Sequence, residues 1–188
     1  ARMVLVGKIN RDFVGAINVH GPLAVGLSGE DAGLITATAH SPELGFVGQV
    51  EAVNPSIIER LLTETLIPVV ATIGMGPEGQ AYNINADTAA GAIAEALRAE
   101  KLVYLTDVEG LRKDPSDPSS LLSTVTTADL EALVENGAVT AGMIPKVASC
   151  IRALRAGVGH AHILDGRVPH ALLLEVFTHE GVGTMVSP

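Results

Sequence analysis

The residues of this chain that are best suited to chemistry lie in segment 82–90 and at Lys146. Asn85 directly precedes an alanine-rich run, and its side-chain oxygen can accept a backbone N–H at a helix start. Asp87 then falls in the first helical turn, where the helix dipole favours a negative charge. Asn83 has no capping role, so we expect an asparagine-rich turn that binds a ligand with an anionic group, as helix N-termini do in α/β proteins.

Lys146 begins a second predicted helix, shortly after the flexible Gly142. A lysine is electrostatically disfavoured at a helix N-terminus, so its position indicates a negative partner, either Asp87 or a phosphate. The alternatives are ordinary ones: Asp87 as a carboxylate that only stabilises its helix, and Lys146 as a solvated surface lysine.

Several other chemistries lack support in the sequence. Neither the P-loop nor the Rossmann glycine pattern occurs, and no G-x-S-x-G nucleophile motif is present. Cys150 falls on an amphipathic helix, where we expect a small buried apolar residue. His160, His162 and His170 lack the helical spacing and acidic partner of a zinc site, so we expect no metal site of that kind.

Composition narrows the class of protein further. The chain has 188 residues, 47% of them apolar and 3% aromatic, which indicates one aliphatic-rich core. A net charge of −9 with scattered Lys and Arg argues against nucleic acid as a partner. No apolar run approaches the roughly 20 residues of a membrane span. A single cysteine fits a reducing cytoplasm, the location we expect.

Periodicity predicts helices alternating with strands. The predicted helices cover 2–19, 55–66, 86–99, 126–137, 145–156 and 169–178. The predicted strands cover 23–27, 34–40, 45–53, 67–74, 101–107, 158–164 and 183–186, with 67–74 continuous and buried on both faces. We expect an exposed loop or hairpin at 112–120. This alternation predicts an α/β fold with a mostly parallel sheet, helices on both faces, and a ligand edge at 73–74, 106–107 and 164–165.

Taken together, five segments resemble the N-acetylglutamate kinases, which belong to the amino acid kinase family. The segments, in order along the chain, are 44–50, 67–71, 82–87, 105–110 and 142–146. The Asn-x-Asn-Ala-Asp and Gly-Met-x-x-Lys elements are the most specific of them, and the resemblance covers essentially the whole chain. It implies a three-layer α/β/α sandwich with a mostly parallel central sheet.

The resemblance also implies ATP-dependent phosphorylation of the side-chain carboxylate of N-acetyl-L-glutamate, the second step of arginine biosynthesis, with Mg²⁺ on the nucleotide. Lys146 would neutralise charge on the transferring phosphoryl group, and Asp87 would orient catalytic lysines. The acceptor would be bound at Asn83, Asn85 and Ala86. The nucleotide would lie along Thr106, Asp107, Val108, Gly110, Val139, Thr140 and Gly142.

A further resemblance concerns regulation. His162, Glu175 and Gly181 match the arginine-binding element of the feedback-inhibited kinases in type and spacing. Glu175 would pair with a cationic group of L-arginine, the implied inhibitor. The alternative is an ordinary amphipathic final helix.

The N-terminal third of the family pattern, including its glycine-rich phosphate loops, has no counterpart here. The resemblance therefore implies a truncated single partial domain, with 1–70 left of the substrate lobe and 71–188 forming the nucleotide lobe with the arginine element. We expect weak binding of ATP–magnesium and little turnover. The full-length kinase would be a homo-oligomer, a hexamer built as a trimer of dimers. Alternatives are a glutamate, aspartate or uridylate kinase of the same family, or a nucleotide- or arginine-binding module without activity.

Overall fold

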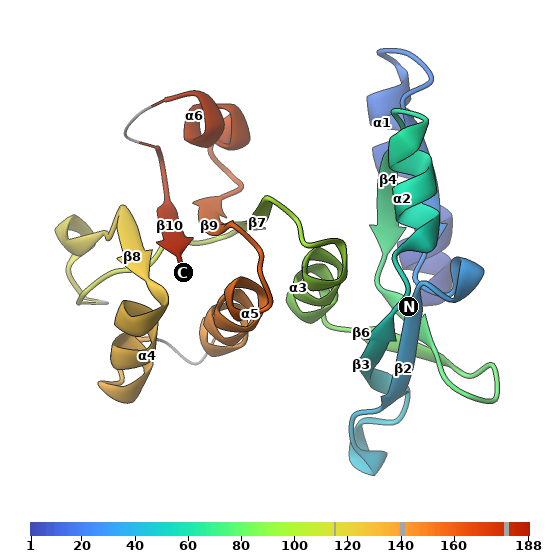
Figure 1. The fold of residues 1–188 in the computed structure, drawn as a ribbon, viewed down its shortest axis with the longest axis horizontal. Coiled ribbons are helices and arrows are strands. Elements are labelled where there is room, and N and C mark those ends of the chain that lie inside the picture. Colours follow the sequence, from blue (N-terminus) through green and yellow to red (C-terminus); the bar gives the residue numbers. More distant parts are fainter. Residues whose placement is uncertain (115, 140–141, 179–180) are drawn as a thin grey trace. The chain divides into compact units, whose positions relative to one another are not determined.

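The computed structural model describes residues 1–114, 116–139, 142–178 and 181–188 (Figure 1). They form two compact units, residues 1–97 and 98–188, each of which is described by itself. The lobe boundary predicted at 70–71 separates the residues expected to bind the acceptor from those expected to bind the nucleotide. The two compact units do not test that division, so it stays a prediction. In the described part of the chain, no helix has the length and apolar character needed to cross a membrane.

The first unit begins with a π-helix and alternates helices with short strands. Its elements are η1 (Met3–Ile9), α1 (Asn10–Asn18), β1 (Ala24–Ser28), η2 (Asp31–Gly33), β2 (Ile35–Ala39), η3 (Pro42–Leu44), β3 (Val47–Val53), α2 (Ser56–Thr63), β4 (Ile67–Ala71), β5 (Ile73–Met75), β6 (Ala81–Ile84) and α3 (Ala86–Leu97).

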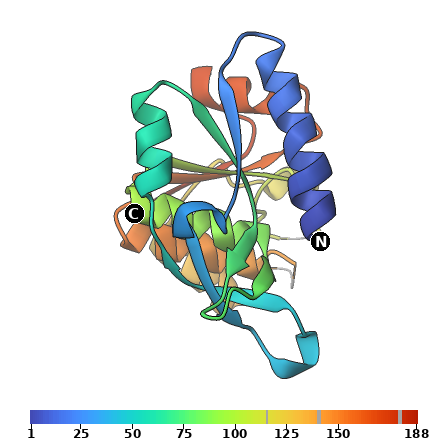
Figure 2. The same ribbon diagram turned by 90° about the vertical axis from the view of Figure 1, so that its right-hand side faces the viewer.

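Two strand assemblies organise this unit. Strands β1 and β4 pair in parallel and lie between α1 and α2 (Figure 2). Strands β2, β3, β6 and β5 close into a small barrel, in which β2 pairs antiparallel with β3. Buried side chains from β2, α2, β6 and α3, among them Ile35, Ile58, Ile84 and Ala89, form one apolar cluster. This cluster joins the barrel to α2 and fixes the start of α3.

The second unit is a four-stranded sheet with helices on both faces. Its elements are β7 (Lys101–Thr106), η4 (Pro118–Ser120), β8 (Thr124–Thr126), α4 (Thr127–Glu135), α5 (Ile144–Arg155), β9 (His160–Asp165), α6 (Ala171–Phe177) and β10 (Thr184–Ser187). The strand order is β7-β9-β10-β8, with β7 parallel to β9 and β10 antiparallel to β9. Figure 1 shows α6 on the face opposite to α4 and α5.

The predicted α/β class, with parallel pairing and helices on both sides of a sheet, is confirmed. Two local predictions were wrong. The run 67–74 is divided at Thr72, because β4 pairs with β1 whereas β5 belongs to the barrel, and Ile67 is 46% exposed rather than buried. The asparagine-rich turn is in part a strand, since Asn83 lies on β6 and pairs with Ile73 and Val47.

We expect Asn10→Ala to destabilise the first unit. Asn10 is buried, and its side-chain amide donates to the carbonyls of Leu27 at 3.2 Å and Val69 at 2.7 Å, which joins α1 to β1 and β4. Its removal leaves buried carbonyls without this donor, at a cost of about 1–3 kcal/mol. Urea unfolding followed by circular dichroism measures the change, with Gln49→Ala, an exposed amide, expected within about 0.5 kcal/mol of the unchanged chain. Equal stability of the two variants would contradict the assignment.

Candidate functional site

In the first unit, the predicted acceptor-binding residues lie where β6 passes into α3. The Asn85 side-chain oxygen accepts the backbone N–H of Thr88 at 3.1 Å, so the predicted helix cap is confirmed. Ala86 and Asp87 are the first two residues of α3, with Asp87 half-buried. Asn83 is exposed on β6, and its backbone N–H donates to the carbonyl of Phe46 at 2.9 Å. Exposed amides therefore lie beside a helix N-terminus that can bind an anionic group.

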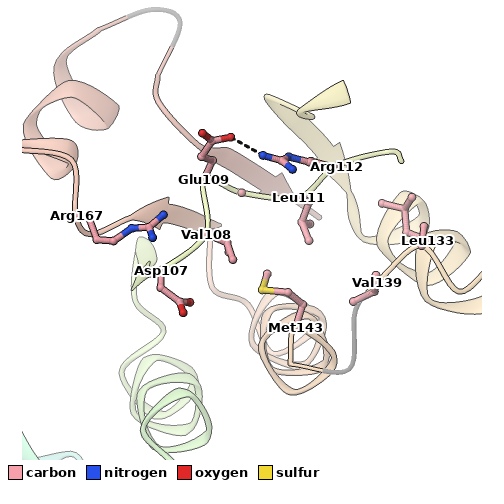
Figure 3. Close-up of a pocket in the computed structure, with 11 residues that line it drawn as sticks. Asp107, Val108, Glu109, Leu111, Arg112, Leu133, Val139, Met143 and Arg167 are labelled. Carbon is pink, nitrogen blue, oxygen red and sulfur yellow. Dashed lines mark hydrogen bonds and ion pairs between the residues drawn. The ribbon is translucent and has the colours of Figure 1, made fainter. Parts of the chain in front are cut away.

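In the second unit, a cavity of about 290 Å³ opens beside the carboxyl end of β7 (Figure 3). Four of the residues predicted for the nucleotide line it: Asp107, Val108, Gly110 and Val139. Glu109, which lies between Asp107 and Gly110 in the family segment 105–110, lines it as well. The sequence analysis missed the other lining residues, which are Leu111, Arg112, Leu133, Ala138, Met143 and Arg167. A signal for Arg167 was present, since it follows the strand end at 164–165.

Thr106 shapes the cavity and is absent from its lining. Its hydroxyl accepts the backbone N–H of Val108 at 2.9 Å and donates to the carbonyl of Val108 at 3.1 Å, which turns the chain directly after β7. Gly110 then adopts φ +152°, and a Cβ there would lie 2.6 Å from the Thr184 hydroxyl. The same hydroxyl accepts the backbone N–H of Leu111 at 2.8 Å. Two threonines and a glycine without space for a side chain thus fix the loop.

The walls of the cavity are apolar and its rim is charged. Val108, Leu111 and Met143 face its interior in Figure 3. At the rim, Arg112 pairs with Glu109 at 2.9 Å. Apolar walls suit a flat ring such as a nucleotide base, whereas the charged groups suit its sugar and phosphates. The volume is near the lower end of the roughly 300–1,000 Å³ range of small-molecule sites, so it fits part of a nucleotide.

A second arginine is held at the rim by the end of β9. The Asp165 carboxylate accepts the backbone N–H of Arg167 at 2.9 Å, and its guanidinium at 2.9 and 2.8 Å. The side-chain and backbone hydrogen bonds from Arg167 lower the pKa of Asp165 to about 2. Asp165 is therefore ionised throughout the physiological range and keeps the guanidinium in place.

Lys146 is the third residue of α5 and is half-buried. Met143, which lines the cavity, immediately precedes that helix, and the exposed Gly142 precedes Met143. The N-terminus of α5 and the cavity are thus adjacent along the chain. Thr140, predicted to lie near the nucleotide, falls outside the described residues. The expected pairing of Lys146 with Asp87 would join the two units, and it stays a prediction.

The three residues predicted for arginine lie together in the second unit. His162 Nδ1 lies 2.7 Å from one oxygen of Glu175, and both side chains are buried. The other oxygen of Glu175 accepts the backbone N–H of Val182 at 2.8 Å. Gly181 has φ +64°, and a Cβ there would lie 2.6 Å from that oxygen. The lack of space for a side chain explains why residue 181 is a glycine. The contacts also show that α6, β9 and the turn before β10 meet at the Glu175 carboxylate.

The electrostatics of this cluster have two notable features. Burial raises the pKa of Glu175, but the hydrogen bonds from Val182 and His162 outweigh it, so the pKa lies below its usual value. His162 Nε2 is buried and finds no hydrogen-bond partner among the residues that the structure describes. Because Nδ1 bonds to an ionised carboxylate, it holds the proton in the neutral ring, and Nε2 is then an acceptor in need of a donor.

Within the described ranges, no group of three or more His, Cys, Asp or Glu side chains is arranged to hold a metal ion. Mg²⁺ is commonly bound by phosphates, waters and one or two carboxylates, so it does not require such a group. Asp107 and Glu109 are the two carboxylates that line the cavity.

Comparisons with known proteins agree with the motifs. The chain is 56% identical to the acetylglutamate kinase of Symbiobacterium thermophilum and 55% identical to that of Moorella thermoacetica, over 99% of its own length and 67% of theirs. The resemblance predicted from the motifs is confirmed. A solved structure, smu.665 from Streptococcus mutans UA159, is 28% identical with a TM-score of 0.80, and the match covers 98% of this chain and 69% of that one.

The model of the amino acid kinase family matches residues 1–165. This match includes both the β6–α3 junction of the first unit and most of the cavity lining in the second. The chain therefore belongs to the amino acid kinase family.

Proposed function

We propose that the chain is part of an acetylglutamate kinase, which transfers a phosphoryl group from ATP to the side-chain carboxylate of N-acetyl-L-glutamate. The observation that carries this proposal is the cavity at the carboxyl end of β7, lined by Asp107, Val108, Gly110 and Val139, in a chain of this family. Ligands of parallel α/β sheets bind at that edge. The name of the two relatives described above, acetylglutamate kinase, supports acetylglutamate as the acceptor.

In this proposal the second unit holds the nucleotide. Val108, Leu111 and Met143 would pack against the base, and Asp107 would accept a hydrogen bond from a ribose hydroxyl. ATP would supply the phosphoryl group, and a lining carboxylate such as Glu109 would help to hold the Mg²⁺ bound with it, which would supply positive charge near the phosphates. Lys146, at the start of α5, would offset the negative charge that develops during transfer. Phosphoryl transfer requires little covalent chemistry from a protein, so catalysis is mainly positioning and fixed charge.

The first unit would hold the acceptor. Asn83 and Asn85 provide amides, and Ala86 marks the N-terminus of α3, whose dipole favours a carboxylate. Asp87, in the first turn of that helix, would orient Lys146. A glutamate, aspartate or uridylate kinase would bind a different acceptor at the same place, and a panel of these substrates separates the alternatives.

We also propose that His162, Glu175 and Gly181 form a regulatory site for L-arginine. The observation that favours it is the buried His162 Nε2, an acceptor without a donor in the described residues, beside an ionised carboxylate. A guanidinium or ammonium group offers several N–H donors and a positive charge, which suits both groups.

We expect Val139→Asp to weaken ATP binding at least tenfold. The substitution places a carboxylate on the cavity wall near Asp107 and Glu109, where it would repel phosphates. Val134→Asp is the matched control, because Val134 is exposed on α4 and absent from the lining. Isothermal titration with ATP–magnesium measures both. Equal affinities of the two variants would place the nucleotide elsewhere.

Removal of the charge at Lys146 should abolish most turnover. We expect the 188-residue chain to turn over little by itself. A chain extended by the N-terminal segment of the Symbiobacterium thermophilum relative should consume ATP with N-acetyl-L-glutamate, and Lys146→Ala should then lower kcat about a hundred- to a thousandfold. Lys113→Ala, an exposed cation, serves as control. Robust turnover by the Lys146 variant would rule out the proposed role.

Binding of L-arginine should follow the ionisation of Glu175. Because its pKa is lowered in the folded protein, the carboxylate stays charged into more acidic solution than an ordinary glutamate does. Affinity should therefore fall once the pH drops through the lowered pKa and the carboxylate loses its charge. Titration calorimetry should also show a loss of at least tenfold for Glu175→Gln, with Glu135→Gln on α4 as control. No binding by the unchanged chain would refute the site.

A further inference from the structure

Arg167 is a cavity residue to which neither the motifs nor the proposed chemistry assigns a role. It comes two residues after the end of β9, and Asp165 is the last residue of that strand. Because β7 and β9 are parallel and Asp165 is in register with Thr106, their carboxyl ends lie side by side. The backbone N–H of Gly166 also donates to the carbonyl of Thr106 at 2.8 Å. Arg167 is therefore fixed where ligands of such sheets bind.

The geometry of Arg167 is that of a preorganised ligand for an anion. Asp165 engages Nε and Nη2 in a two-point fork, and Nη1 is not part of that fork. Asp165 is buried, whereas the Arg167 side chain is 66% exposed. The buried carboxylate thus holds the guanidinium in place at the rim of the cavity. Such an arrangement reduces the entropy that the side chain would lose on contact with a ligand.

The charge balance of the cavity also depends on Arg167. The rim carries two carboxylates, Asp107 and Glu109, and two guanidinium groups, Arg112 and Arg167. Figure 3 shows Arg167 between the two acidic side chains, and both of them attract it, in addition to its main partner Asp165. Loss of Arg167 makes the site more negative by one charge and leaves the ionised Asp165 without its guanidinium partner, so a polyphosphate is repelled more strongly. A nucleoside, which is uncharged, would not be repelled.

We infer that Arg167 is a specificity-determining residue that makes the cavity prefer nucleoside polyphosphates over nucleosides. This inference rests on the proposed function, that the cavity holds a nucleotide. Asp165 acts as a positioning residue through Arg167. If Arg167 only maintained the loop geometry, its loss would weaken the binding of nucleosides and of nucleotides equally.

The test is a comparison of ATP–magnesium with adenosine by isothermal titration of the 188-residue chain. Arg167→Gln should lower the affinity for ATP about ten- to a hundredfold, the range for one hydrogen bond between charged groups. Its affinity for adenosine should stay within about twofold. The ATP affinity of Arg167→Lys should lie between that of the unchanged chain and that of Arg167→Gln, because lysine keeps the charge but loses the two-point fork. Lys113→Gln removes the same charge from an exposed position outside the lining and should change neither affinity.

A second variant distinguishes loss of the Arg167 charge from misfolding, because a misfolded chain would not regain affinity. Glu109→Gln combined with Arg167→Gln restores the charge balance and releases Arg112 from its pair with Glu109. We expect this double variant to recover most of the lost ATP affinity. A ratio of ATP to adenosine affinity that is unchanged in Arg167→Gln would overturn the inference and leave the nucleotide site intact. Failure of the unchanged chain to bind either ligand would overturn the proposed function, and the inference with it.

Discussion

The parallel pairing of β7 with β9 is the constraint on which the rest of the second unit depends. Six residues of each strand are in register, from Lys101 with His160 to Thr106 with Asp165. This register brings the two carboxyl ends to one edge, so that the loop after Thr106 and the arginine after Asp165 line the same cavity. A shift by one residue would turn Asp165 to the opposite face of the sheet and remove the anchor of Arg167.

The side chains of β9 face different helices on the two sides of the sheet. His162 points toward α6, where it meets Glu175. Tyr104 is in register with Ile163, and it bonds to Ser149 of α5 at 2.8 Å, so the alternate residues face the other helix layer. The proposed regulatory cluster and the cavity edge thus share one strand. A buried acidic side chain secures each of them: Glu175 of α6 at the regulatory cluster, and Asp165 at the end of β9.

The sequence predicted well where local chemistry decides the structure. The cap at Asn85, the strand ends at 106 and 165 and most helices follow from side-chain types and spacing that act within a few residues, whereas the strand end expected at 73–74 is wrong because Ile73 and Gly74 belong to β5. It predicted poorly where pairing between distant segments decides. The break at Thr72 leaves no mark in an unbroken apolar run, because it reflects a change of partner from β1 to β2 and β6. Arg167 follows a strand end that the sequence did predict, but which residues share a cavity with it depends on the register of β7 with β9.

The residues proposed for the phosphoryl donor and those proposed for the acceptor belong to different units. All the described cavity residues and the start of α5 belong to the second unit, so the proposed nucleotide site is built from that unit. The amides proposed for the acceptor and Asp87 belong to the first unit. Phosphoryl transfer demands that donor and acceptor be held within a few ångströms, in line. The proposed reaction therefore depends on how the two units are held together, whereas the charge preference assigned to Arg167 is a property of the second unit alone.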